Sequence, residues 1–383
     1  MRISSASYAY PRLDTESRAT IARRLLTSPV PDDTVVLSTC LRVEIVTSGD
    51  AKHLRRVLHS ILGEELTEQI PGQIRSDRAA VVHLARVAAG LESPILGEVE
   101  ILSQFRQAVN EAEKAGRIGG IFARLMEALV SIGRRGRDLI PGSAHASMGM
   151  IAAQAVGAAT EVAIFGSGTM ATAVATALRS LPAPPRVTLL ARRPSAVTIT
   201  GVEVWPFERV LEALEHFPAV VSATSAKQRP IDDDSLRGVL SARTSPLVLV
   251  DMAMPPDFVP PDGSMVEYVD IDALARVADR RPRGEDADAF VADAAAEAHH
   301  RFADHHEIAP IISGMVASAD DIVERVVQRF AGRLQSEEEI AVLRQAAHTV
   351  SRTLLAGPIE YVKRADSNET LEALAEAFGV ADE

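Results

Sequence analysis

Residues 162–171 read Val162-Ala163-Ile164-Phe165-Gly166-Ser167-Gly168-Thr169-Met170-Ala171, a short apolar run that leads into a glycine turn. The apolar run predicts a buried strand, and residues 173–181 predict a helix after the turn. A Gly-x-Gly-x-x-Ala turn in this context is typical of a dinucleotide site, because glycine lets the backbone approach a pyrophosphate whose charge the helix N-terminus receives. We therefore expect cofactor contacts from Gly166, Ser167, Gly168, Thr169, Met170 and Ala171.

Three more apolar runs follow this turn, at residues 187–190, 219–223 and 247–251, and helical stretches separate them. Strands that alternate with helices predict a parallel, doubly wound sheet of the Rossmann type. The first of these runs is followed by Arg192 and Arg193, in a region where an NAD enzyme usually has an acidic residue. The two arginines favour NADPH as the cofactor; in the alternative interpretation they only cap a surface loop.

The region before this sheet has a mixed pattern. Residues 34–46 contain two short β-rich runs, and helical patterns follow at residues 51–62, 77–90 and 98–115. This combination predicts an α+β domain of the size of one folding unit. Its boundaries are expected at residues 1–145, before a Rossmann-type domain at 146–284.

The region after the sheet is expected to be entirely helical. Beyond residue 284 the strand signals stop, and an Ala-, Asp- and Glu-rich helical pattern continues, with an interruption expected near Pro310. A long helix with an apolar stripe has to bury that stripe. We therefore predict that residues 285–383 form an all-α linker and dimerisation domain, and that the protein is a homodimer.

The composition limits the classes of function. The chain has 383 residues, of which 47% are hydrophobic and 24% charged, as in an ordinary globular protein. No apolar run has the length of a membrane span and the N-terminus has no apolar signal core, so we expect a cytoplasmic protein with no membrane partner. A net charge of −12 argues against non-specific affinity for nucleic acid, although local basic sites at residues 55–56 and 134–137 are compatible with it.

Cys40 is the single cysteine of the chain and lies directly after a predicted strand. Because it cannot form an internal disulfide, packing, metal ligation and covalent catalysis are the uses open to it. Arg42 lies two residues further on, and a nearby cation lowers a thiol pKa and increases the thiolate fraction. On these residues alone, a buried inert thiol and a catalytic nucleophile are equally supported.

Four histidines lie close together in the helical region, at positions 299, 300, 305 and 306. Metal ligation by such a group usually involves further Cys, Asp or Glu ligands at defined spacings. No cysteine accompanies them, so we expect structural or solvated roles for these histidines and no metal site.

Two motifs carry a resemblance to a known family. The first is Ser38-Thr39-Cys40-x-Arg42-x-Glu44, and the second runs from His83-Leu84 through Gly90-Leu91-Glu92-Ser93-Pro94-Ile95-Leu96-Gly97-Glu98 to Gln104. Together with the dinucleotide turn they resemble glutamyl-tRNA reductase, over nearly the whole chain. The resemblance implies an NADPH-dependent oxidoreductase that converts glutamyl-tRNA to glutamate-1-semialdehyde, the first step toward tetrapyrroles such as porphyrins. It also implies a catalytic, an NADPH-binding and a dimerisation domain.

The resemblance assigns roles by position. Cys40 matches the family's nucleophile, which forms a thioester that accepts hydride more readily than an ester does. His83 matches a catalytic histidine. The partners implied are glutamyl-tRNA, a second copy of the chain and an aminotransferase that acts on glutamate-1-semialdehyde. The positions expected to bind the substrate are Thr39, Leu41, Arg42, Ser93, Glu98, Val99, Glu100 and Gln104.

Several pocket positions depart from the family pattern. Leu41 stands where Asn is usual, Val43 where Thr is usual, and Val99-Glu100 replace a usual Pro-Gln. Exchanging polar for apolar side chains leaves buried groups without partners unless the ligand changes as well. The alternatives are therefore a paralogue that reduces another activated acyl group, or a non-catalytic dinucleotide-binding dimer with a regulatory role.

Overall fold

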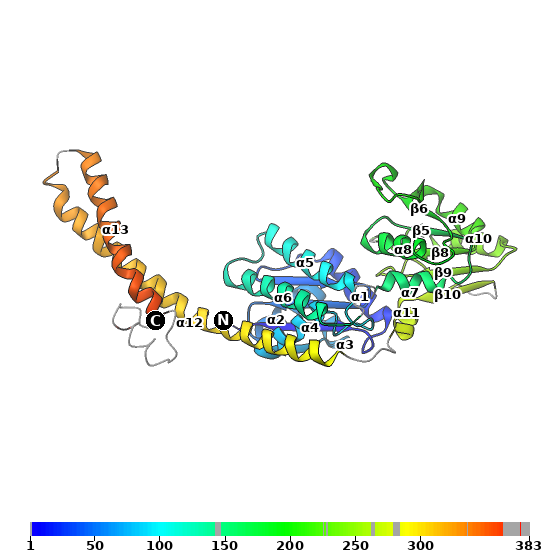
Figure 1. The fold of residues 1–383 in the computed structure, drawn as a ribbon, viewed down its shortest axis with the longest axis horizontal. Coiled ribbons are helices and arrows are strands. Elements are labelled where there is room, and N and C mark those ends of the chain that lie inside the picture. Colours follow the sequence, from blue (N-terminus) through cyan, green and yellow to red (C-terminus); the bar gives the residue numbers. More distant parts are fainter. Residues whose placement is uncertain are drawn as a thin grey trace. The chain divides into compact units, whose positions relative to one another are not determined.

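The computed structural model describes residues 2–141, 147–224, 226, 229–261, 265–278, 284–334, 336–362 and 376, without the side chains of 304–310. The chain divides into two compact units, Arg2–His299 and the part from His300 onward. The first unit holds two domains, each built around one β-sheet, and the described residues of the second unit are helical (Figure 1). We call residues 2–141 the N-terminal domain and residues 147–278 the central domain.

The N-terminal domain contains an antiparallel sheet with the strand order β2-β3-β1-β4. The two β-rich runs predicted around Cys40 are present as β2 and β3. The sequence did not predict β1 and β4, since both are short and rich in Ser, Ala or Gln. The elements are β1 (Ser4–Ala9), α1 (Thr15–Thr27), β2 (Thr34–Ser38), β3 (Arg42–Thr47), α2 (Ala51–Leu62), α3 (Glu64–Gln69), β4 (Gln73–Ser76), α4 (Asp77–Ala88), α5 (Val99–Lys114) and α6 (Gly120–Asp138).

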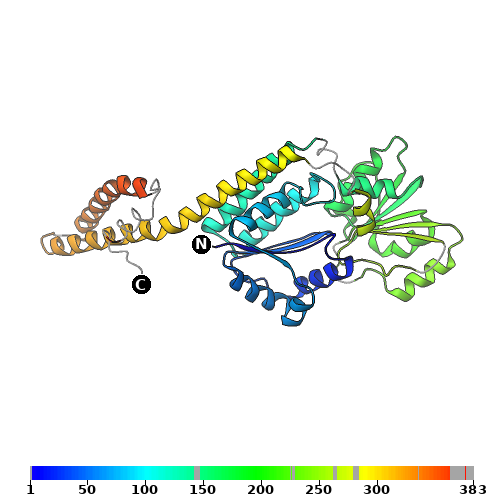
Figure 2. The same ribbon diagram turned by 90° about the horizontal axis from the view of Figure 1, so that it is seen from below.

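The two faces of this sheet differ because alternate residues of a strand point to opposite sides. Ala6, Tyr8, Val43 and Ile45 form a buried apolar core with residues of α1 and α2, the blue helices below the sheet in Figure 2. The register of β1 and β3 pairs Ser7 with Glu44. Because these two alternate with the core positions, polar groups lie on the opposite face, where α4 packs.

The central domain has a six-stranded parallel sheet in the order β10-β9-β8-β5-β6-β7. This is the doubly wound Rossmann order, in which a ligand binds outside the carboxyl ends of the strands. The four predicted strands are β5, β6, β8 and β9; the edge strands β7 and β10 are short and carry Pro or acidic residues that weaken a strand signal. The elements are α7 (Met148–Ala155), β5 (Glu161–Phe165), α8 (Thr169–Arg179), β6 (Arg186–Ala191), η2 (Pro194–Ala196), β7 (Glu203–Pro206), η3 (Phe207–Arg209), α9 (Val210–His216), β8 (Ala219–Ser222), α10 (Asp233–Ala242), β9 (Leu247–Asp251), β10 (Val266–Asp270) and α11 (Ile271–Ala278).

Two long helices follow, α12 (Glu285–Ala331) and α13 (Glu337–Val362). The expected interruption near Pro310 is wrong, because α12 continues through this position; one proline removes one helical hydrogen bond, and the bonds on either side remain. None of the described helices is long and apolar enough to cross a membrane. The predicted fold class, an α+β domain, a Rossmann-type domain and a helical C-terminal region, is confirmed. The exact boundaries 1–145, 146–284 and 285–383 stay a prediction.

Candidate active site

Cys40 lies in the tight turn between β2 and β3 and is half-buried. Thr39 holds this turn. Its backbone N–H donates to the carbonyl oxygen of Arg42 at 2.8 Å, and its hydroxyl oxygen accepts from the N–H of Arg42 at 3.1 Å. The Thr39 hydroxyl, which the sequence assigns to substrate binding, is therefore already engaged with the backbone beside the thiol.

Glu44 is the centre of a buried polar cluster on the face of the sheet next to α4. Its Oε1 accepts hydrogen bonds from Ser7 Oγ at 2.8 Å and from Arg42 at 3.0 Å, and lies 3.1 Å from His83 Nε2. Burial alone would raise the pKa of this carboxyl, but the hydrogen bond and charge of His83, followed by Arg42 and Ser7, hold it below its usual range. Arg42 also donates to the backbone carbonyl of Glu92. The cluster joins two predicted functional positions, Arg42 of the first sequence motif and His83 of the second.

The thiol environment differs from the one that the sequence suggests. Burial, and next the negative charge of Glu98, raise the pKa of Cys40 to about 12. The cation that opposes this rise most is Arg18 of α1. Arg42 is engaged with Glu44 and with the Glu92 carbonyl, and the expectation that it activates the thiol stays a prediction.

A glycine pair positions the second motif. Gly90 and Gly97 have φ values of 73° and 71°, in the left-handed region that favours glycine. A Cβ on Gly90 would lie 2.9 Å from the backbone nitrogen of Glu98. The loop can close only with glycine at this position, and its closure brings Ser93 Oγ to 3.3 Å from Glu98 Oε1.

Glu98 and Glu100 are two buried carboxyls near the start of α5. Burial, and next the charge of Glu100, raise the pKa of Glu98 to about 7, against the opposing effects of Arg42 and Ser93. Glu100 Oε1 accepts from Ser147 Oγ, the N-cap of α7, while its buried Oε2 has no hydrogen-bond partner among the described residues. Acidic charge therefore predominates on this side of Cys40.

The other predicted substrate positions lie in different surroundings. Leu41 is 5% exposed and belongs to an apolar cluster formed largely by the central domain. Ile95 joins it there, and the half-buried Cys40 packs against the same cluster. Gln104 is half-buried, and Val99 is 39% exposed at the start of α5. Leu41 thus fixes the Cys40 turn to the central domain, which accounts for an apolar residue at this position.

The glycine turn lines a cavity of about 900 Å³ at the carboxyl ends of the central strands. Gly166 has a φ of 109°, and a Cβ there would lie 2.6 Å from the carbonyl oxygen of Ala223. Gly168 is the N-cap of α8, while Ala171 is buried inside that helix. The predicted residues on the cavity wall are Gly166, Ser167, Gly168, Thr169, Met170, Arg192 and Arg193; Ala196, Phe207, Ala223, Thr224, Ala226 and Pro230 complete it.

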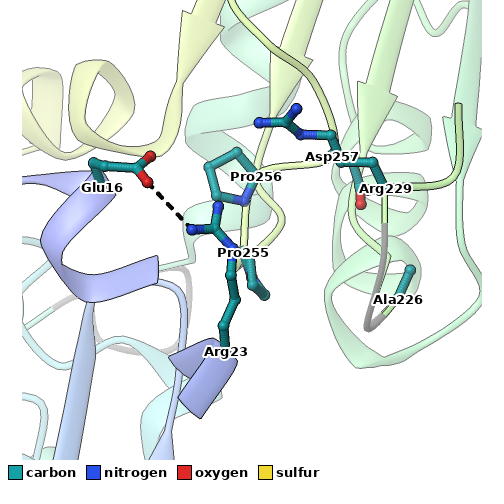
Figure 3. Close-up of a pocket in the computed structure, with 7 residues that line it drawn as sticks. All are labelled: Glu16, Arg23, Ala226, Arg229, Pro255, Pro256 and Asp257. Atoms are coloured by element: carbon teal, nitrogen blue, oxygen red, sulfur yellow. Dashed lines mark hydrogen bonds and ion pairs between the residues drawn. The ribbon is translucent and has the colours of Figure 1, made fainter. Parts of the chain in front are cut away.

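A second cavity, of about 450 Å³, lies between α1 and the loops after β8 and β9 (Figure 3). Figure 3 shows Arg23 paired with Glu16 on one side and Asp257 on the other. Asp257 is buried and accepts hydrogen bonds from Ser222 at 2.6 Å and Thr224 at 2.8 Å. Because Thr224 also lines the cofactor cavity, Asp257 joins the walls of the two cavities.

Three family models match successive regions of the chain. The model of the N-terminal domain of glutamyl-tRNA(Glu) reductase matches residues 11–139, that of its dimerisation domain residues 286–380, and that of shikimate/quinate 5-dehydrogenase residues 150–277. A glutamyl-tRNA reductase from Salinispora tropica is 30% identical over 376 residues, covering 90% of this chain and 81% of that protein. The chain belongs to the glutamyl-tRNA reductase family. Membership confirms the predicted family and the prediction of an oxidoreductase.

A solved structure of a glutamyl-tRNA reductase, from Methanopyrus kandleri, is also similar. It is 24% identical, covers 99% of each chain and has a TM-score of 0.46.

The cofactor cavity suits the nicotinamide dinucleotide implied by the family. Gly166 and Gly168 line the cavity at the start of α8, and the predicted contact of this turn with a pyrophosphate stays a prediction. Arg192 and Arg193 are exposed at the end of β6, where they can meet a ribose phosphate. A bound nicotinamide dinucleotide would supply a hydride; the residues of this cavity would orient it.

Sequence reasoning did not single out Arg18, Glu44 or Ser147 as site residues. Glu44 could have been found from the sequence, because it lies two positions after Arg42 in a predicted strand and therefore shares its face. Arg18 and Ser147 carried none, because their partners Asp272 and Glu100 are 254 and 47 positions away in the chain. Among the described residues, no group of three potential metal ligands is present.

Proposed function

We propose that this chain reduces glutamyl-tRNA to glutamate-1-semialdehyde with NADPH, through a thioester on Cys40, at the start of tetrapyrrole synthesis. The observation that carries the proposal is the position of the Cys40 turn. Its Leu41 packs into the core of the central domain, the domain whose glycine turn lines the cofactor cavity. A nucleophile and a hydride site are thereby held on two domains of one compact unit.

The chemistry proceeds in two stages. In the first, the Cys40 sulfur attacks the ester carbonyl; a C–S bond forms, the ester C–O bond breaks, and the tRNA leaves as an alcohol after taking a proton. In the second, hydride adds to the thioester carbonyl carbon and the oxygen takes a proton; this proton then passes to the sulfur as the C–S bond breaks, which releases the aldehyde and the thiol. Glu98, with a pKa of about 7, is suited to accept the thiol proton and return it to the leaving oxygen.

His83 and Arg42 have supporting roles in this proposal. His83 Nε2 lies 3.1 Å from Glu44 Oε1, and this contact holds the imidazole ring in one orientation. From there, His83 can donate a proton to the developing alkoxide. Arg42 fixes the Glu92 carbonyl and with it the loop that carries Ser93 and Glu98. The predicted substrate contacts of Ser93, Glu98 and Glu100 stay part of the proposal.

The proposal extends to assembly. Dimerisation would involve the region matched by the family's dimerisation domain, where an apolar groove lies between α12 and α13. An aminotransferase that takes up the aldehyde product, and a cytoplasmic location, belong to the same proposal.

The decisive assay measures glutamate-1-semialdehyde from glutamyl-tRNA and NADPH. Wild-type protein should form the aldehyde, and Cys40→Ser should form none, since a hydroxyl is a far weaker nucleophile than a thiolate. Binding of NADPH should be the same in both proteins. Aldehyde formation by the serine variant, or none by the wild type, would reject the function.

A second candidate is a non-catalytic regulatory dimer. The observation that favours it is the raised pKa of Cys40, which keeps the thiol protonated near neutral pH in the absence of ligand. If Cys40→Ser restores growth of a strain that lacks this protein as well as the wild type does, this candidate is supported.

A further inference from the structure

Asp257 is a buried carboxylate on the loop that follows β9, and neither stage of the proposed chemistry uses it. Its side chain accepts a hydrogen bond from Ser222 Oγ at 2.6 Å and another from Thr224 Oγ1 at 2.8 Å. Ser222 is the last residue of β8, and Thr224 lies two positions beyond it. The carboxylate therefore ties the loop after β9 to the end of β8.

The hydrogen bonds of the parallel sheet continue as far as Ala223, whose backbone N–H donates to the carbonyl oxygen of Phe165 at 2.9 Å. At Thr224 a side chain continues this anchoring. The Thr224 hydroxyl donates to Asp257, and its oxygen accepts from the backbone N–H of Ala226 at 3.3 Å. Asp257 thus fixes, through Thr224, the first residues of the loop that leaves the sheet.

These loop residues form one end of the cofactor cavity. Thr224 and Ala226 line it beside β8, Arg192 and Arg193 line it beside β6, and the glycine turn after β5 lies between them. In a Rossmann-type sheet the pyrophosphate lies at the turn after the first strand, and the adenosine ribose lies beside the end of the second strand. A dinucleotide bound in this way would extend its nicotinamide half toward Thr224 and Ala226.

Ser222 and Thr224 donate to the same carboxylate but differ in their position. Ser222 is fully buried within β8 and is not among the described residues that line the cofactor cavity. Thr224 is half-buried on the wall of that cavity. Either hydrogen bond stabilises the fold, because a buried polar group is costly to leave without a partner. The bond to Thr224, in addition, sets the position of the cavity wall.

We propose that Asp257 is a positioning residue for the nicotinamide half of the cofactor, because it holds Thr224, and through it Ala226, at this end of the cavity. The inference rests on the proposed function, in which the cofactor is NADPH. Asp257 lines the second cavity (Figure 3) and is not among the described residues that line the cofactor cavity, so it acts through Thr224. The adenosine half of the cofactor, which lies toward β6, should not depend on it.

The test compares two ligands on the full-length protein by isothermal titration calorimetry. NADPH carries both halves of the cofactor, and 2′,5′-ADP carries the adenosine half without the nicotinamide. We expect Asp257→Ala to raise the Kd of NADPH about tenfold, the effect of losing one hydrogen bond to a charged group. The same variant should bind 2′,5′-ADP with the affinity of the wild type.

Three further variants separate positioning from structural support. Thr224→Val keeps the shape of the side chain, removes its hydroxyl and should weaken NADPH binding as Asp257→Ala does. The double variant should bind NADPH no more weakly than either single variant, since both substitutions break the same interaction. Ser222→Ala is the matched control: it removes the other hydrogen bond to the same carboxylate, should lower the melting temperature and should bind both ligands as the wild type does. If Asp257→Ala does not fold, judged by circular dichroism, Thr224→Val and Ser222→Ala still decide.

The proposal is overturned if Asp257→Ala and Thr224→Val bind NADPH as the wild type does, or if their effects multiply in the double variant. An equal loss of 2′,5′-ADP binding would show a general loosening of the domain and would overturn it too, as would a wild type that does not bind NADPH. The titrations contain no tRNA. A protein that shows the expected pattern but forms no aldehyde would therefore contradict the proposed function and leave this inference standing.

Discussion

The charged residues around Cys40 have opposite effects on the pKa of its thiol. Burial, and next Glu98, disfavour the thiolate, while Arg18 favours it. A substrate that brings an ammonium group to Glu98 would shift this balance toward the thiolate. The reactivity of the thiol should thus depend on the substrate.

Glu98 should make stability depend on pH. Its pKa rises from 4.5 to about 7 on folding, so the folded state binds more protons in this range and the free energy of unfolding falls as pH increases. The shift corresponds to about 3 kcal/mol. Glu98→Gln should remove this share of the decline in urea unfolding between pH 4.5 and 7. Burial and Asp257 also raise the pKa of Asp251 to about 7. Part of the decline in the free energy of unfolding should therefore remain in the Glu98→Gln variant. An unchanged decline would show that Glu98 is ionised in the folded protein.

Removing the charge of Glu44 should lower the free energy of unfolding more than removing that of a carboxylate at the edge of the cluster. Glu44→Gln leaves the buried Arg42 without its counter-charge, a loss of about 3–5 kcal/mol in the free energy of unfolding. The matched control is Glu92→Gln, which breaks the half-exposed pair with Arg86 and should cost less than about 1 kcal/mol. Urea denaturation of both variants measures the difference. Equal losses would contradict the central position of Glu44.

At the scale of elements, the β5–turn–α8 unit could be predicted from the sequence because every requirement lies within ten consecutive residues. The hairpin around Cys40 and the helices α2, α4 and α5 were predicted for the same reason. Strands β1 and β7 could not be, since their residues are ordinary for loops and pair only with partners distant in sequence. Helix α12 continues past Pro310 because of the helical residues on both sides of it. The proline alone, considered locally, predicted an interruption.

Alanine substitutions of the two glycines in this turn should have different effects, one on stability and the other on cofactor binding. Gly166→Ala places a Cβ 2.6 Å from the Ala223 carbonyl at a φ of 109°, so it should lower the free energy of unfolding by about 1–3 kcal/mol. Gly168→Ala meets no atom within 4 Å. It should leave stability unchanged within about 0.5 kcal/mol and weaken NADPH binding, because the added methyl enters the cofactor cavity.

Thermal unfolding and NADPH titration of the two variants test this contrast. A stable Gly166→Ala protein, or a Gly168→Ala protein with normal NADPH affinity, would contradict the geometry of the turn.

At the scale of the whole molecule, the sequence motifs identified the polar cluster but not what surrounds it. The motifs placed Cys40, Arg42, His83 and Glu98 in one region, and the structure joins two of them, Arg42 and His83, through Glu44. Leu41 was expected to line the substrate pocket because of its place in the motif. Its burial against the central domain depends on residues more than a hundred positions away, which local patterns do not encode.

The C-terminal helices should mediate dimerisation. Leu354 is 71% exposed and lines the apolar groove between α12 and α13. Leu354→Asp should convert a dimer into a monomer of 41.0 kDa in light scattering, since a charge in an apolar contact is costly to bury. Thr353→Asp adds the same charge at an exposed position beside the groove and should stay dimeric. A monomeric wild type, or a dimeric Leu354 variant, would place the contact elsewhere.

The proposed function depends on the transfer of the substrate's acyl group to Cys40. Incubating the protein with glutamyl-tRNA in the absence of NADPH, followed by mass spectrometry of the Cys40 peptide, tests it most directly. We expect a glutamyl adduct on Cys40 that disappears, with release of glutamate-1-semialdehyde, once NADPH is added. An unmodified Cys40 peptide, alongside aldehyde formation when NADPH is present, would contradict it.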